Sequence, residues 1–308
     1  MVRPDVLSVL VAYVSAIGPG ALGTQLLVGL SRSMILFLVA SGLTLILGVL
    51  RVINFAHGSL YMIGAFLASS VFSMLGEGST GFWLALVFAP LGVALVGLLM
   101  ERGLLRYIYE REHLLQALLT FAVLLILGDL VKLIWGVQER YMSPPDFLVG
   151  CFLVFGLPVA RYNMFLIVIG FLVAIGLWLF IDKTRTGKIS RAVAADRETV
   201  GALGINAGWV FATVFLLGAW LAGLGGALIA PTITITLGMD IGLIIEAFLV
   251  VIMGGMGNMW GALTGSLIIG LAHSYGVLFW SQFSIVFPYV IAAILLIVRP
   301  SGLLKSTW

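Results

Sequence analysis

Two polar, glycine-rich stretches interrupt long apolar runs in this sequence, and their side chains are the first candidates for chemistry. Residues 48–64 carry Asn54, His57 and Ser59, and residues 253–267 carry Asn258. Each stretch places an asparagine ahead of a Gly-Ser-Leu tripeptide. Backbone groups that such a break frees inside a membrane need partners from protein or water, because lipid offers none. Corresponding breaks in two halves of a chain indicate the central site of a transporter.

These residues allow two interpretations, and the sequence leaves both open. In one, Asn54, His57 and Asn258 line a water-filled path. In the other, the two asparagines cap helices and His57 packs at a turn beside Arg51. Glu246 lies within an apolar run, so it is a candidate pathway residue or the partner of a charge on a neighbouring helix or chain.

Two further charge arrangements carry expectations. Asp129 and Lys132 are three residues apart in one apolar run, so we expect them to pair. Arg32 lies near enough to the end of a run for its side chain to reach the membrane interface.

The longest polar run, Asp182–Asn206, divides the chain. As one helix, Ile189–Leu203 would carry a narrow apolar stripe with Asp196 in its middle, and Gly204 would end it. Such a helix either lies in the lipid headgroups or docks into a groove on a soluble partner. The stripe is rich in Ala and Val and lacks Trp or Phe, which favours docking.

Composition identifies the class of protein. The chain has 308 residues, of which 62% are hydrophobic and 9% charged, and its mean hydropathy is +1.20. Runs of this length and hydrophobicity predict an all-α polytopic membrane protein, and a β-barrel would require alternating strands. The 38 glycines suit close helix packing in lipid. The lone Cys151 makes no internal disulfide.

The sequence predicts one transmembrane domain, residues 1–308, of about eight or nine transmembrane helices with broken helices in two inverted halves. The first half covers about 22–181 and the second about 207–300, with the segment 182–206 between them. Val6–Ile17 is too short to span and is expected at the interface or partway in. The expected spans are Leu22–Leu50, Gly58–Leu75, Gly81–Met100, Leu114–Trp135, Asn163–Ile181, Val210–Ile229, Ile241–Gly255, Ala262–Trp280 and Ile285–Val298.

The distribution of Lys and Arg predicts the orientation. They concentrate in Glu101–His113 and in the segment 182–206, so both should be cytoplasmic together with the C-terminal tail. Two expected spans separate Glu101–His113 from the segment 182–206, and four separate that segment from the C-terminal tail. An even number of crossings returns the chain to the same side of the membrane, which agrees with that placement. Gly136–Tyr162 is then external, and its stretch Phe147–Phe155 predicts a small hairpin.

Signatures of catalysis are missing. The sequence contains no His-Glu-x-x-His, no Gly-x-Ser-x-Gly and no Cys/His cluster for zinc. Gly187-Lys188 lacks the preceding glycine and the following Ser or Thr of a phosphate loop. We therefore expect neither an enzyme nor a bound metal.

Three motifs resemble one family over nearly the whole chain. Gly42–Ser59, then Thr186–Ala192 continuing to Asn206, and Glu246–Ala262 are similar to the signatures of the permease subunits of branched-chain amino-acid ABC importers, the LivH-like group. Two departures are visible. Lys188 stands where the family usually has Arg, and Gln138–Val159 matches only loosely.

The resemblance implies a bacterial inner-membrane importer with a second permease, two ATPase subunits that hold ATP and Mg²⁺, and a periplasmic binding protein. This chain itself would bind no cofactor, and no nucleic acid is expected. The solute would be leucine, isoleucine, valine or a related urea, amide or acid. Pathway candidates are Asn54, His57, Ser59, Glu246 and Asn258, and the candidates for ATPase docking are Arg185, Gly187, Lys188, Ile189, Arg191, Ala192, Val193, Asp196, Val200, Leu203 and Gly204.

Another class of function is an ion-coupled secondary transporter or channel. It would need several carboxylates inside the membrane, and the sequence indicates only Glu246 and Asp129. A membrane enzyme is disfavoured because catalytic sets are missing.

Overall fold

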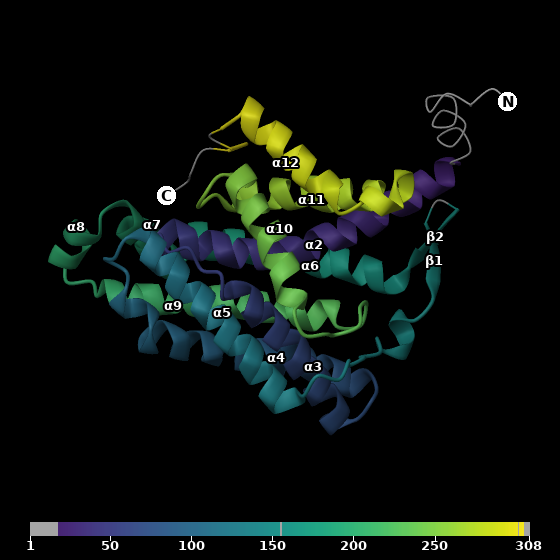
Figure 1. Ribbon diagram of the computed structural model, residues 1–308, viewed down its shortest axis with the longest axis horizontal. Coiled ribbons are helices and arrows are strands. Elements are labelled where there is room, and N and C mark those ends of the chain that lie inside the picture. Colours follow the sequence, from purple (N-terminus) through teal and green to yellow (C-terminus); the bar gives the residue numbers. More distant parts are fainter. Residues whose placement is uncertain (1–17, 155, 301, 305–308) are drawn as a thin grey trace.

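The computed structural model describes residues 18–154, 156–300 and 302–304, so Val6–Ile17 lies outside the described residues (Figure 1). Within them, seven helices are long and apolar enough to cross a membrane, which confirms a polytopic all-α membrane protein. These are α2 (Pro19–Leu50), α3 (His57–Leu75), α4 (Ser79–Gly103), α5 (His113–Trp135), α6 (Arg161–Lys183), α9 (Ala207–Ile229) and α11 (Met259–Phe279).

The described residues also form four shorter α-helices: α7 (Arg185–Ala195), α8 (Arg197–Ala202), α10 (Met239–Gly254) and α12 (Val286–Val298). The predicted span Ile241–Gly255 forms α10, which is too short to be among the seven candidate crossings. At 16 residues α10 is about 24 Å long, and it runs across α2 and α11 instead of alongside them (Figure 1). The predicted last span forms α12, an apolar helix of 13 residues. The inverted relation of the two halves stays a prediction.

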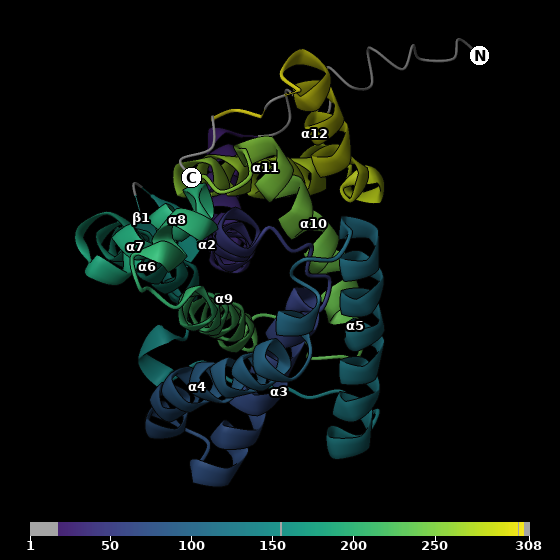
Figure 2. The same cartoon turned by 90° about the vertical axis from the view of Figure 1, so that its left-hand side faces the viewer.

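Helix α2 is the centre of the bundle. It packs against α6, α9, α10 and α11, and its stretch from residue 33 to residue 44 is buried throughout. Viewed from the end that carries α7 and α8, α2 is enclosed, whereas α5 and α12 lie at the edge (Figure 2). Helix α9 packs on the other side against α3 and α4.

Glycines set the distance between α3 and α9. A Cβ atom added to Gly64 would lie 2.5 Å from the carbonyl oxygen of Gly223, so only glycine permits this approach. Close contact between small residues is a principal source of helix association in lipid, where burial of apolar surface drives little.

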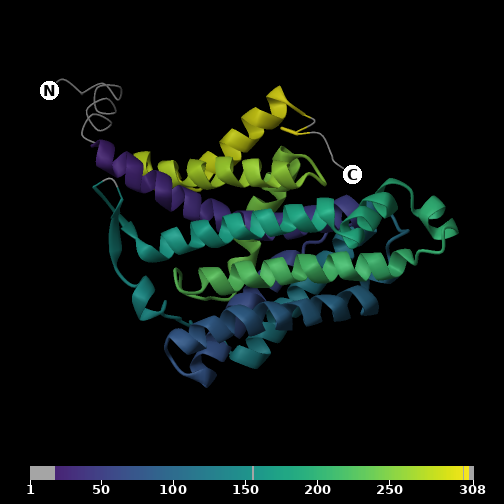
Figure 3. The ribbon, with the colours of Figure 1, turned by 180° about the vertical axis from the view of Figure 1, so that it is seen from behind.

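The two ends of the bundle differ. One end carries a two-stranded antiparallel sheet, β1 (Cys151–Val154) and β2 (Leu157–Ala160), and the opposite end carries α7 and α8 (Figure 3). The predicted hairpin is confirmed, but its bounds are wrong. Phe147 belongs to a 3₁₀ turn, Asp146–Leu148, and the sharp turn needs the positive φ of Gly156 (+79°), beyond the predicted range.

The last described residues are attached to the end of α10. The amide of Leu303 donates to the carbonyl of Met253 (2.7 Å), and that of Leu304 donates to Gly254 (3.3 Å). Gly255 has φ +99°, and a Cβ there would lie 2.0 Å from the carbonyl oxygen of Leu304. This contact is therefore restricted to glycine.

Candidate functional site

The segment of residues 51–56 enters the bundle between α2 and α3. Arg51, with φ +56°, reverses the chain after α2 ends at Leu50. The Nε2 atom of His57, the first residue of α3, then lies 3.0 Å from the carbonyl oxygen of Val39. Val39 is eleven residues before Leu50, about 16 Å along α2. Helix α3 therefore begins inside the bundle, and His57 packs against α2 as its first residue instead of at a turn beside Arg51.

A threonine of α5 supports the irregular backbone of this segment. The buried Thr120 hydroxyl accepts from the amide of Phe55 (3.2 Å) and donates to the carbonyl of Ile53 (2.9 Å). Such bonds are required where non-helical backbone lies at membrane depth. The sequence analysis missed Thr120, because nothing in an apolar run indicates which helix will face a distant loop.

A second helix begins inside the bundle beside the first. After α9 ends at Ile229, Ile235 pairs with Arg140, and the chain turns at Gly238 (φ +85°) into α10. A Cβ on Gly58 would lie 2.8 Å from the carbonyl oxygen of Asp240. The first turns of α3 and α10 are thus in direct contact.

Two buried polar side chains join these first turns. The Ser59 hydroxyl donates to Oδ2 of Asp240 at 2.8 Å, and neither residue is more than 2% exposed. Ser59 was predicted from the sequence. Asp240 was missed because it directly precedes the predicted span Ile241–Gly255. The acidic residue just after a glycine and before an apolar run was the available signal.

Asn54 and His57 bring unsatisfied polar atoms to the same segment. Both residues are fully buried, and in the part of the chain that the structure describes, Oδ1 and Nδ2 of Asn54 and Nδ1 of His57 have no hydrogen-bond partner. Asn54 does not cap α3, whose N-cap is Ala56. An unsatisfied buried polar group costs about 1–3 kcal/mol. Such groups are rare in folded proteins, so each one requires a structural or functional explanation.

Asn258 lies elsewhere and has another role. Its Oδ1 accepts from the amide of Gly261 (3.0 Å) as the N-cap of α11. It follows the far end of α10, which separates it from Asp240 by about 24 Å of helix. The helix-cap interpretation is confirmed for Asn258, and the structure does not bring it together with Asn54.

Glu246 forms an ion pair between α10 and α2. The Nη2 atom of Arg32 lies 2.9 Å and 3.0 Å from the two carboxylate oxygens. This confirms pairing with a neighbouring helix, and the expectation that Arg32 reaches the membrane interface stays a prediction. The predicted pair of Asp129 and Lys132 is wrong, since no ion pair joins them among the described residues. Both side chains are exposed on α5, where holding them together would gain little.

The segment 182–206 forms two helices instead of the predicted one. Helix α7 ends at Ala195, and α8 begins after Asp196, whose Oδ1 accepts from the amide of Thr199 (3.0 Å). Asp196 is therefore an exposed N-cap and not part of an apolar stripe. Hydrogen bonds from the hydroxyl and amide of Thr199 lower the pKa of Asp196. Gly204 follows α8 with φ +82°, as predicted.

Burial divides the residues predicted for docking. Gly187, Val193 and Val200 are buried within this chain, and a Cβ on Gly187 would lie 2.3 Å from the carbonyl of Phe180. Ile189 and Arg191 are half-buried, the latter paired with Asp182 at 2.9 Å. The residues available to a partner are Arg185, Lys188, Ala192, Asp196, Leu203 and Gly204.

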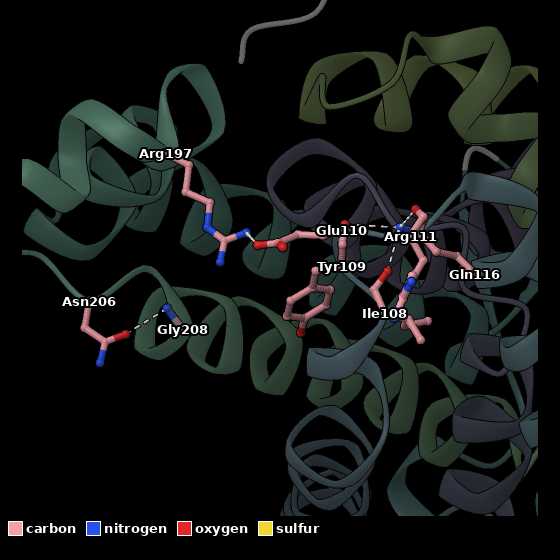
Figure 4. A network of polar contacts seen from close by, with 8 residues as sticks. All are labelled: Ile108, Tyr109, Glu110, Arg111, Gln116, Arg197, Asn206 and Gly208. Carbon is pink, nitrogen blue, oxygen red and sulfur yellow. Dashed lines mark hydrogen bonds and ion pairs between the residues drawn. The ribbon is translucent and has the colours of Figure 1, made fainter.

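A cleft of about 340 Å³ lies between the end of α7 and the α4–α5 connection, and Figure 4 shows polar contacts around it. Across it, Arg197 pairs with Glu110 at 3.4 Å, so the connection between α4 and α5 and the segment 182–206 share one end of the protein. Tyr109 donates to Glu101 at 2.6 Å, and burial together with this carboxylate raises the pKa of Tyr109. Arg51 at the cleft donates to the carbonyl of Ala194 (3.1 Å).

Comparison with known proteins decides the family. Residues 25–299 match the family model described as the permease component of the branched-chain amino acid transport system. The chain belongs to this permease family. It is 31% identical to the high-affinity branched-chain amino acid transport permease BraD of Pseudomonas aeruginosa, over 91% of this chain and 94% of that protein.

Further relatives give the same picture for this permease. It is 28% identical to LivH of Escherichia coli K12, over 87% of this chain and 90% of the relative. A probable branched-chain amino acid transport permease LivH of Methanocaldococcus jannaschii is 30% identical over 79% of this chain and 77% of the relative. No solved structure matches. The matched region of the permease includes both internal helix starts and the α7–α8 pair.

Proposed function

We propose that this permease subunit carries branched-chain amino acids, or related small polar solutes, through an ATP-driven importer of a bacterial inner membrane. The observation that carries the proposal is the meeting of α3 and α10 inside the bundle, where buried polar groups surround their first turns. Broken helices that begin near the membrane centre are typical of transport sites. The names of the relatives support the solute class.

The exposed side of α7 and α8 is the proposed docking surface for an ATPase subunit. Lys188, Arg51, Arg111 and Arg197 all lie at that end, which favours a cytoplasmic position for it. The remaining partners are a related second permease, a second ATPase subunit and a periplasmic binding protein. ATP and Mg²⁺ would bind to the ATPase subunits, so this chain needs no cofactor of its own.

A direct contact links that surface to the central site. The guanidinium of Arg51 bonds to the carbonyl of Ala194 in α7, and Arg51 begins the segment that leads into α3. Closure of the ATPase dimer would displace α7, and Arg51 would pass the displacement to residues 51–56. The first turn of α3 would then shift relative to α10 and open the path to one side at a time.

Reconstitution of the complete complex in proteoliposomes tests the proposal. We expect L-leucine uptake that requires ATP and the binding protein. Asp196→Lys should leave assembly and ATP hydrolysis intact but reduce uptake, whereas Glu198→Lys on the same short helix is the matched control. Normal transport by an assembled Asp196→Lys complex would refute the docking assignment. Uptake by the purified subunit alone along an ion gradient would instead indicate a secondary transporter.

A further inference from the structure

The first turns of α3 and α10 enclose a carboxylate that none of the permease comparisons assigns. We propose that Asp240 receives the ammonium group of the solute at an occluded site between these two helix starts. This inference rests on the proposed import function and narrows it. The solutes accepted would carry a primary ammonium group, as amino acids do, and urea or simple amides would not satisfy the site.

The first argument is the missing countercharge. Among the residues that the structure describes, no Lys, Arg or His lies within ion-pair distance of Asp240, and its one side-chain hydrogen bond comes from Ser59. An ionised carboxylate offers about four acceptor positions, so most of them are open to a new donor. A buried charge inside a membrane protein is paired or marks a substrate path.

The second argument is how this carboxylate is stabilised before a solute arrives. Asp240 lies in the first turn of α10 and contacts the first turn of α3. The N-terminal ends of helices carry partial positive charge that favours an anion within one turn. The site can therefore hold a carboxylate without a permanent cation, and an entering ammonium group does not have to displace one.

The third argument is the unpartnered amide of Asn54. This side chain is fully buried on the segment that leads into α3, and neither its oxygen nor its nitrogen has a partner among the described residues. Its nitrogen is a donor suited to the carboxylate end of an amino acid. Asn54 lies two residues before the N-cap of α3, and Ser59 in the first turn of α3 is bonded to Asp240. The proposed site would therefore use Asp240 for the ammonium end of the solute and Asn54 for its carboxylate end.

The other acidic residues of the bundle do not offer the same site. Glu246 is already paired with Arg32, and Asp129 is exposed on α5. The buried Glu101 accepts from Tyr109 beside the α7–α8 end, away from the two internal helix starts. Asp240 alone among these combines burial, an open carboxylate and a position where two helices begin.

The test compares Asp240→Asn with Ser59→Ala in the complete complex, measured as ATP-dependent uptake of radiolabelled L-leucine into proteoliposomes. Both variants weaken the bond between α3 and α10, but only the first removes the charge. We expect Asp240→Asn to lower the initial uptake rate at least about tenfold, the effect of losing one charge-assisted hydrogen bond. Ser59→Ala removes one hydrogen bond to the carboxylate but keeps its charge, so its loss of uptake should be several-fold smaller than that of Asp240→Asn. Asp129→Asn, an exposed carboxylate, is the control without effect.

Each outcome decides the proposal. Equal losses in Asp240→Asn and Ser59→Ala would show that Asp240 only fastens α10 to α3, and normal uptake by Asp240→Asn would also overturn it. If Asp240→Asn does not assemble, Asp240→Glu replaces it. The shifted carboxylate should raise the KM for leucine while ATP hydrolysis persists, and an unchanged KM would refute the site. Absence of ATP-dependent uptake by the wild-type complex would contradict the proposed function itself.

Discussion

The Arg32–Glu246 pair allows a quantitative prediction about what holds α10 in place. One guanidinium nitrogen contacts both carboxylate oxygens, and the side chains are 39% and 14% exposed. Breaking a fully buried ion pair costs about 3–5 kcal/mol because one charge is left uncompensated. Since Arg32 is partly exposed, we expect each single substitution to cost about 1–3 kcal/mol, between that value and the small value of a surface pair.

The two single variants should differ in a defined direction. Arg32→Gln leaves the more buried Glu246 without a countercharge, whereas Glu246→Gln leaves the more exposed Arg32, so the first should be the less stable. The double variant Arg32→Gln/Glu246→Gln should recover about 1–2 kcal/mol relative to the sum of the singles. Unfolding in detergent measures all four proteins. Additivity within about 0.5 kcal/mol, or the reverse order of the singles, would refute the reasoning.

Three further predictions concern the helix contacts, the entering segment and the α7–α8 break. Gly64→Ala should destabilise the protein by about 1–3 kcal/mol, because the new Cβ would meet the backbone of Gly223. Gly128→Ala is the control, since its Cβ would enter open space and the helix should gain up to about 1 kcal/mol of stability. Equal melting temperatures for the two variants would contradict this. Thr120→Val removes both hydrogen bonds to residues 53–55, so it should lower the free energy of unfolding by about 1–3 kcal/mol and slow uptake. Unchanged stability and uptake would argue against this role of Thr120. Asp196→Ala should speed hydrogen exchange in α8, whereas Asp196→Asn should preserve the cap. The pKa of Asp196 is lowered in the folded protein, so the cap contributes fully above about pH 4, the usual pKa of an aspartate. Below that pH, the protection of α8 from hydrogen exchange should decrease as the pH falls through the pKa of folded Asp196. Asp196→Asn should show no such decrease.

Features that depend on length and composition were predictable from the sequence. Helices long enough to cross a membrane follow from continuous hydrophobicity, and the α8 end at Gly204 follows from the residue that best tolerates a positive φ. The polar residues at 54, 57 and 59 were also recognisable, because polar side chains are conspicuous within an apolar run.

Features that depend on contacts between distant segments were not predictable. Whether a largely apolar helix of 16 residues crosses the membrane or lies across other helices is decided by the packing of α10 against α2, α3 and α11. The periodicity of the sequence carries no information about that packing. The break at Asp196 was missed because a carboxylate in a short polar helix fits both a helix interior and an N-cap. Asp240 and Thr120 became visible only when their partners on α3 and in residues 53–55 were known.

The attachment of the tail to α10 has a practical consequence. Since backbone bonds hold Leu303 and Leu304 to the last turn of α10, a fluorophore attached at position 304 would travel with that helix. Its distance to a second dye on α7 would then follow the relative motion of these two elements during each turnover. Conversely, a deletion that removes Leu303 and Leu304 would take away two restraints on α10 without touching the polar centre, and so would separate the rigidity of this helix from its chemistry.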